Sequence, residues 1–127
     1  MRIQTVLLVD DEPDIRLVAG LSLEQVGGWA VELASSGAEA LAMLATDAAR
    51  PDVILLDVMM PGLDGPAVLA RLRDDPALAR IPVIFLTAKA GSRETGALSA
   101  LGAKGIIRKP FDPMTLAATV REIVEQA

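Results

Sequence analysis

Five short apolar runs recur along the chain, and each is followed by a stretch with the periodicity of a helix. The strands predicted from these runs lie near residues 5–9, 29–34, 52–57, 82–87 and 105–108. Helices are predicted near residues 13–26, 36–47, 64–74, 92–101 and 113–126. Because parallel strands need crossover connections, this alternation predicts an α/β fold in which helices cover both faces of a doubly wound, five-stranded parallel sheet.

The predicted strands differ in how completely they are buried. The runs at 6–9, 53–56 and 83–86 are apolar throughout, as strands covered on both faces should be. The run at 30–34 alternates in polarity, with Glu32 at its centre, and this suits a strand at the edge of the sheet.

Several helix starts carry recognisable signals. Ser36 and Glu39 have the spacing of a capping box, which predicts the start of the second helix. Asp112 followed by Pro113 predicts a cap and first turn for the last helix. An acidic residue followed by Pro13 marks the first helix in the same way.

Composition sets limits on the function. The 127 residues fit a single domain spanning 1–127, and the absence of cysteine and histidine removes disulfides, thiolate metal sites and the commonest general base. A formal net charge of −5 argues against direct binding of nucleic acid. No apolar run approaches the ~20 residues of a membrane helix. A cytoplasmic domain without membrane insertion is therefore expected.

Reactive polar residues follow four of the predicted strands. They are Asp10 and Asp11 after the first, Asp57 at the end of the third, Thr87 at the end of the fourth and Lys109 after the fifth. Ligands of open α/β sheets bind at the carboxyl ends of the strands. The sequence therefore predicts that three acids, a hydroxyl and an amine share one crevice.

Three neighbouring carboxylates repel one another, and a hard divalent cation relieves that repulsion. Oxygen ligands alone select Mg²⁺ (or Mn²⁺) over zinc. Lys109 and Thr87 add a positive charge and a donor for a group with several negative oxygens. Phosphoryl transfer to a carboxylate needs these parts, and Asp57 is already ionised at neutral pH, so no general base is required.

The order of these motifs resembles that of the receiver domain of bacterial two-component response regulators, in its stand-alone, chemotaxis-regulator-like form. The matching stretches are LVDDEP at residues 8–13, LLDVMMPGLDG at 55–65, LTA at 86–88, GA at 102–103 and KPF at 109–111. Each stretch alone is a modest signal, but all of them in order, each after the expected strand, make a strong one.

The resemblance implies a flavodoxin-like fold with strand order 2-1-3-4-5. It implies that Asp57 accepts a phosphoryl group from a phosphohistidine on a sensor histidine kinase or a histidine phosphotransfer protein. Asp10 and Asp11 match the family's metal-binding acids, with the backbone carbonyl of Met59 as a further ligand. Thr87 matches the switch hydroxyl. Lys109 matches the lysine that contacts the phosphate, and its bond to Pro110 is expected to be cis.

One position departs from the family pattern. The family usually carries Tyr or Phe three residues before the lysine, where this chain has Ile106. In the family this aromatic ring rotates as a partner of the switch hydroxyl. An isoleucine cannot make that in-or-out motion, so Thr87 is not expected to have an aromatic partner.

The leading hypothesis is a phosphorylation-controlled receiver without an attached output domain, which presents its fourth helix, fifth strand and fifth helix to a downstream protein. It is expected to be a monomer or a phosphorylation-promoted homodimer. It is not expected to be a turnover enzyme, although it catalyses its own phosphorylation and dephosphorylation. The alternative is a vestigial receiver that acts as a constitutive interaction module. A haloacid-dehalogenase-type phosphatase is disfavoured, because Met59 stands where a second Asp is needed.

Simpler roles are predicted for several other residues. Asp64 is expected to cap a helix or turn rather than bind a ligand, and Trp29 to anchor the start of the second strand. The methionines are expected to fill the core or pack loops; they are Met43, Met59, Met60 and Met114. Solvated charges are expected at Lys89, Arg93, Lys104 and Arg108.

Overall fold

A computed structural model describes residues 2–46, 50–88 and 91–126, and it has the architecture that the alternation of strands and helices predicts. The strands are β1 (Thr5–Val9), β2 (Ala30–Ala34), β3 (Val53–Asp57), β4 (Val83–Thr87) and β5 (Gly105–Arg108). The helices are α1 (Pro13–Gln25), α2 (Gly37–Leu44), α3 (Gly65–Asp74), α4 (Ser92–Ala100) and α5 (Leu116–Glu125). Predicted positions 47 and 89 lie outside the described residues.

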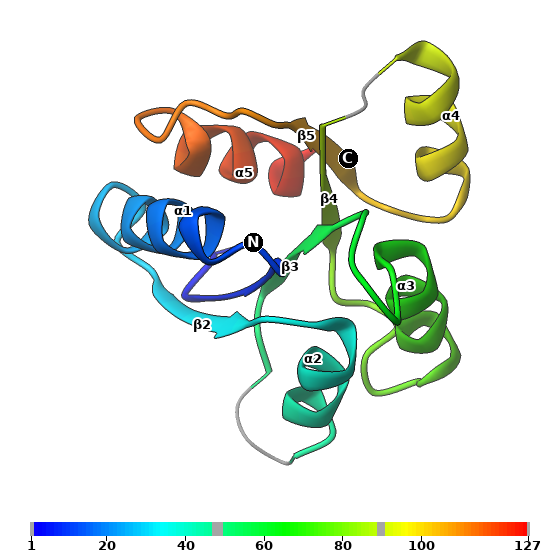
Figure 1. Cartoon of the computed structure of the whole chain (residues 1–127). Helices are drawn as coiled ribbons and strands as arrows, with labels where there is room; N and C mark the ends of the chain where they lie inside the picture. The colour runs from blue at the N-terminus through cyan, green and yellow to red at the C-terminus, as the bar shows by residue number, and fades with distance from the viewer. Residues whose placement is uncertain (1, 47–49, 89–90, 127) are drawn as a thin grey trace.

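The sheet is parallel and its order is β2-β1-β3-β4-β5, which confirms the flavodoxin-like fold. Helices α1 and α5 cover one face, and α2, α3 and α4 cover the other (Figure 1). β2 lies at one edge and is the most exposed of the apolar runs, as its alternating sequence indicates. β3 and β4 lie inside the sheet and are buried at every residue.

Alternation along the strands sorts the core into two clusters. Val6 and Leu8 of β1 belong to the cluster under α1 and α5, whereas Leu7 and Val9 belong to the cluster under α2, α3 and α4. The other inner strands divide in the same way, because successive side chains of a strand point to opposite faces. This parity also sets which face each side chain favours as a strand ends.

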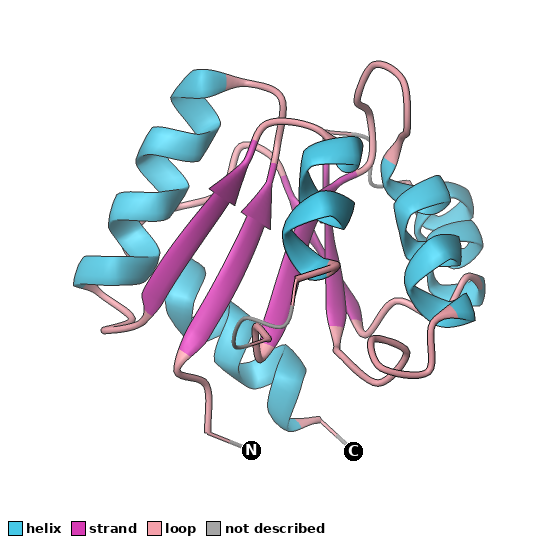
Figure 2. Ribbon diagram, turned by 90° about the horizontal axis from the view of Figure 1, so that it is seen from below, coloured by secondary structure: helices cyan, strands magenta, loops and turns pink. Residues whose placement is uncertain are grey.

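The amino and carboxyl ends of the strands lie at opposite sides of the molecule (Figure 2). All five strands run in one direction, so their carboxyl ends lie together. Both described chain ends lie on the other side, near the amino ends of the strands (Figure 2). Trp29 lies just before β2, is 7% exposed and packs into the core near that opposite edge, as expected for an anchor. No helix in the described ranges has the length and hydrophobicity needed to cross a membrane.

Some helix starts differ from the prediction. α5 begins at Leu116 rather than at residue 113. The Asp112 carboxylate accepts a hydrogen bond from the Met114 N–H, and the Asp112 backbone carbonyl accepts one from the Leu116 N–H. These bonds form a separate turn before the helix. α1 begins at Pro13 after Glu12, but the Glu12 side chain makes no capping bond. Asp64 caps α3 as predicted, by accepting from the Ala67 N–H at 2.9 Å.

The expectation of a packing role is wrong for two methionines. Met59 is 68% exposed and Met114 is 72% exposed, whereas Met60 is buried in the core. Both exposed residues lie in loops that follow strands, where apolar periodicity gives no information about burial.

The capping box at the start of α2 is present in a modified form. The Ser36 hydroxyl accepts from the Glu39 N–H at 3.0 Å, while Glu39 Oε1 accepts from the Ser35 N–H at 2.7 Å rather than from the Ser36 N–H. Two amide groups at the helix start are thereby satisfied.

We expect Ser36→Ala to lower the free energy of unfolding by about 1 kcal/mol, because the Glu39 N–H loses its acceptor. Urea unfolding followed by circular dichroism measures this change. Ser35→Ala is the matched control, since the Ser35 side chain makes no hydrogen bond within the described ranges. Equal losses for the two variants would contradict a capping role for Ser36.

Candidate functional site

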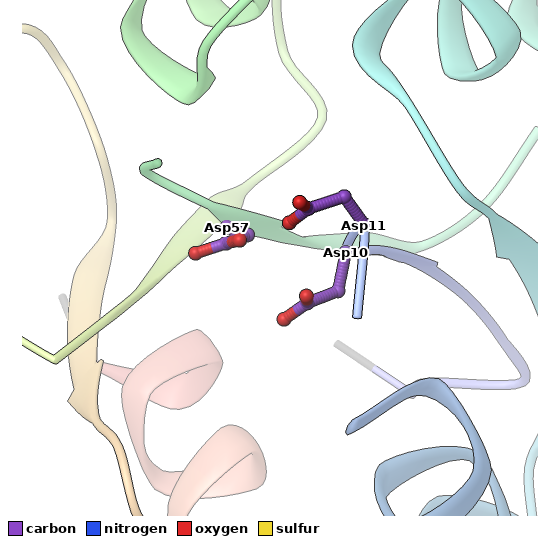
Figure 3. A group of neighbouring side chains, drawn as sticks. All are labelled: Asp10, Asp11 and Asp57. Atoms are coloured by element: carbon purple, nitrogen blue, oxygen red, sulfur yellow. The ribbon is translucent and has the colours of Figure 1, made fainter. Parts of the chain in front are cut away.

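Three carboxylates meet at the carboxyl end of the sheet. Asp10 and Asp11 follow β1, and Asp57 ends the neighbouring β3 (Figure 3). One oxygen from each carboxylate lies within 4.8 Å of the others. Asp10 and Asp57 are buried, whereas Asp11 is partly exposed. The predicted convergence of the three acids is therefore present.

Strand parity explains which residues converge. Val6 and Leu8 point toward α1 and α5, and Asp10 continues that series; Val53 and Leu55 lead in the same way to Asp57. Ile107 of β5 also belongs to this face, and Lys109 lies two residues beyond it.

Lys109 brings a positive charge to the acids. Its Nζ lies 2.6 Å from Asp10 Oδ2 and 3.3 Å from Asp57 Oδ1. Its side chain is only 10% exposed, so water screens these contacts weakly. The Lys109–Pro110 peptide bond is cis, as expected.

Two partners of Asp10 were not predicted from the sequence. The Glu12 N–H donates to Asp10 Oδ1 at 2.9 Å, and Arg16 Nη1 donates to the Asp10 backbone carbonyl at 2.7 Å. Both belong to the start of α1, so a search for polar side chains one helical turn past the strand-end acids could have found Arg16. The Glu12 carboxylate is 3.8 Å from Lys109 Nζ, but it is exposed and contributes little.

Strand parity assigns Thr87 to the face of the sheet opposite to that of Asp57. Thr87 continues the series of Val83 and Phe85, which faces α2, α3 and α4. Thr87 is buried at the end of β4, and its carbonyl accepts from the Lys109 N–H at 2.8 Å. The five predicted site residues therefore lie at the same end of the sheet, and Thr87 also lines a cavity beside α4.

The cavity that Thr87 lines has a volume of about 250 Å³ and lies beside α4. Its lining consists mainly of apolar groups, from Val58, Met59, Thr87, Glu94, Ala97 and Leu98. Ile106 of β5 lies opposite Phe85 and is partly buried against the same cluster. The position where the family usually has an aromatic residue is thus packed into the core.

The surroundings of Asp57 make its ionised form less favourable than it would be in water when no cation is bound. Burial raises the pKa of Asp57 from 3.8 to about 6, the charge of Asp10 adds to the rise, and Lys109 opposes it. Burial alone would lower the pKa of Lys109, but its hydrogen bond to Asp10 and the charges of Asp10 and Asp57 outweigh burial and raise it.

The donor set fits a hard divalent cation. Three carboxylates offer oxygen ligands, and Asp10 Oδ2 is fully buried with no hydrogen-bond partner beyond its ion pair with Lys109. Oxygen donors of this kind are the preferred ligands of Mg²⁺ and Mn²⁺. A bound cation would also reverse the upward shift in the pKa of Asp57, because positive charge favours the ionised form.

The raised pKa predicts how stability depends on pH. The folded chain holds a proton on Asp57 more tightly than the unfolded chain does, so ionisation destabilises the fold as pH rises from 3.8 through about 6. In metal-free buffer we expect Asp57→Asn to raise the free energy of unfolding at neutral pH by about 2 kcal/mol, somewhat below the full value of the shift because neighbouring charges adjust. The gain should vanish below pH 3.8.

Urea unfolding at a series of pH values measures this gain. Asp64→Asn is the control, because Asp64 is an exposed helix cap and asparagine caps equally well. A gain for Asp57→Asn that does not change with pH would contradict the shifted pKa.

Comparisons with known proteins agree with this geometry. A family model described as the response regulator receiver domain matches residues 6–121. The response regulator PleD of Caulobacter vibrioides is 43% identical over 120 residues, which cover 93% of this chain and 25% of PleD. The response regulator Rre1 of Synechocystis is 38% identical over 122 residues, which cover 94% of this chain and 51% of Rre1. The chain thus spans between a quarter and about half of the length of these relatives.

Solved structures give the same result over whole chains. The chemotaxis protein CheY4 of Vibrio cholerae superimposes with a TM-score of 0.86 at 34% identity, covering 96% of this chain and 99% of CheY4. The match therefore extends over nearly all of the chain. This chain belongs to the family of response regulator receiver domains.

Proposed function

We propose that the chain is a phosphoacceptor in two-component signalling and that Asp57 is the residue phosphorylated. The observation that carries this proposal is the position of the Asp57 carboxylate between two further acids and Lys109, with Lys109 Nζ 3.3 Å from Asp57 Oδ1. No other carboxylate ending a strand in the described ranges combines burial with a lysine and two acidic neighbours.

The donor would be a phosphohistidine on a sensor histidine kinase or a histidine phosphotransfer protein. An Asp57 carboxylate oxygen attacks the phosphorus, the new P–O bond replaces the P–N bond, and the electron pair of the P–N bond stays on the imidazole. Lys109 neutralises charge on the transferred oxygens. Asp10 and Asp11, with the Met59 backbone carbonyl, would hold Mg²⁺ or Mn²⁺. When bound, that cation supplies positive charge to the phosphoryl oxygens.

This chemistry makes the chain its own catalyst for phosphorylation and dephosphorylation rather than a turnover enzyme. The phosphoryl group adds about −1.5 to −2 charges by analogy with other phosphorylated side chains. The Lys109 ammonium then binds the new phosphoryl oxygens, which weakens its ion pair with Asp10. We expect the Thr87 hydroxyl to move toward these oxygens, which changes the cavity beside α4.

The resulting surface would be formed by α4, β5 and α5 and would bind a downstream protein or a second copy of the chain. Phosphorylation changes this surface only if the phosphoryl group favours one of two conformations of the chain. Because Ile106 replaces the usual aromatic residue, the change at α4 is expected to pass through Thr87 and Leu98, which line the same cavity.

A constitutive interaction module is the competing function, and the packed Ile106 is the observation that favours it. Incubation with acetyl phosphate separates the two. We expect intact-mass spectrometry to show the addition of one phosphoryl group with Mg²⁺ present and none with excess EDTA. Absence of the adduct at every Mg²⁺ concentration would refute the phosphoacceptor and favour the constitutive module.

A further inference from the structure

A groove of about 340 Å³ lies at the edge of the sheet opposite the acids. Pro82, directly before β4, and Lys104, directly before β5, form part of its lining. Arg73 from the end of α3 and Arg80 from the loop before β4 complete its charged part. This is the edge at which the strands begin in Figure 2.

The charge of the groove is opposite to that of the protein. The chain carries a formal net charge of −5, yet every charged side chain that lines the groove is basic. In the described ranges no carboxylate lies within ion-pair distance of Arg73, Arg80 or Lys104. Three cations around one hollow, with no ion-pair partner in the part of the chain that the structure describes, create a local positive potential that attracts anions.

Arg73 is oriented in this groove by three hydrogen bonds to backbone carbonyls. Its Nη1 donates to the carbonyls of Ala79 at 2.9 Å and Ile81 at 3.1 Å, and its Nη2 donates to the Gly102 carbonyl at 3.1 Å. Arg73 is only partly exposed, and this partial burial lowers the pKa of its guanidinium. The three carbonyls leave two of the five guanidinium N–H donors for a ligand.

The other two cations also keep donors available. Lys104 was expected to be a solvated charge, but it is only partly exposed and donates to the Gln126 carbonyl, which leaves two of its three ammonium hydrogens. The Arg80 side chain is exposed and makes no hydrogen bond within the described ranges.

We propose that this groove binds a compact diphosphate group, either as free inorganic diphosphate or as part of a nucleoside diphosphate. Guanidinium groups bind phosphate oxygens in a bidentate manner, and two of them face the groove with a lysine. The volume lies at the small end of ligand pockets. The lining contains no aromatic side chain on which a nucleobase could stack, so the phosphates are the part that is recognised.

Isothermal titration with inorganic diphosphate tests the proposal. The titration is done in Mg²⁺-free buffer with EDTA, so that the probe is not chelated. We expect Arg80→Gln and Lys104→Gln each to weaken binding by about tenfold, the loss of one charge-assisted hydrogen bond. Arg71→Gln is the control. It removes one positive charge from the helix that carries Arg73, but Arg71 does not line the groove. Asp57→Asn should bind diphosphate as tightly as the unmodified chain.

Three results would overturn the proposal. They are no heat of binding, an equal loss of affinity for Arg71→Gln and Arg80→Gln, or tighter binding of an Asp/Glu-rich peptide than of diphosphate. Adenosine diphosphate distinguishes the sources of the ligand. Affinity equal to that of free diphosphate means that only the phosphates are recognised, and a higher affinity assigns the groove to a nucleotide.

Discussion

Replacing Asp57 by asparagine is expected to abolish phosphorylation by acetyl phosphate. Asparagine has nearly the same shape, but its amide is a poor nucleophile and carries no negative charge to attract a cation. The raised pKa of Asp57 makes the variant at least as stable as the unmodified chain in metal-free buffer, so loss of the reaction cannot be ascribed to unfolding. Intact-mass spectrometry after incubation with Mg²⁺ and acetyl phosphate measures the loss.

Asp64→Asn is the matched control, since it removes an exposed carboxylate seven residues further along the chain while keeping the cap of α3. It should gain the phosphoryl group at the normal rate. If Asp57→Asn still gained one, another side chain would be the acceptor, and peptide mapping would locate it.

Lys109→Gln is expected to slow phosphorylation by roughly 10²–10³-fold, the usual effect of removing one group that stabilises charge in a transition state. Two physical effects act together. The ammonium that lies 3.3 Å from Asp57 Oδ1 is lost, and the pKa of Asp57 rises further because Lys109 no longer lowers it. A smaller fraction of Asp57 is then ionised at neutral pH.

Rates come from the growth of the phosphorylated mass with time, at neutral pH and again about two units higher. Part of the loss should be recovered at the higher pH, where Asp57 ionises more fully. Lys104→Gln serves as the control, because Lys104 lies just before the opposite end of the same strand. An unchanged rate for Lys109→Gln in a folded protein would remove Lys109 from the mechanism.

The sequence predicted the fold correctly because its signals repeat. The apolar runs at 6–9, 53–56 and 83–86 are short, continuous and followed by helical periodicity, which leaves few alternatives to a parallel sheet. Convergence of Asp10, Asp11 and Asp57 followed from the same argument, since parallel strands place their carboxyl ends together. The order of the strands came from the family resemblance.

Other features depend on tertiary contacts that have no period in the sequence. Arg16 can be picked out as a polar residue one helical turn past the strand end, but its contact with the Asp10 carbonyl depends on how the strand end and the helix turn lie relative to one another. The exposure of Met59 reflects a loop path, and the position of Arg73 reflects its hydrogen bonds to the carbonyls of Ala79, Ile81 and Gly102. The face of the sheet to which Thr87 belongs is different, because counting alternate residues along β4 is enough to assign it.

The position of Trp29 has a practical consequence for spectroscopy. It is the only tryptophan, the chain has no tyrosine, and Arg121 lies 5.2 Å from the ring centre. Ultraviolet fluorescence therefore comes from a single buried ring just before β2, whereas Asp57 lies at the carboxyl end of β3. We expect the Trp29 emission to change when the chain unfolds and to stay the same when a cation or a phosphoryl group binds at the site. A tryptophan introduced at the exposed position of Met59 would give the site an optical signal of its own.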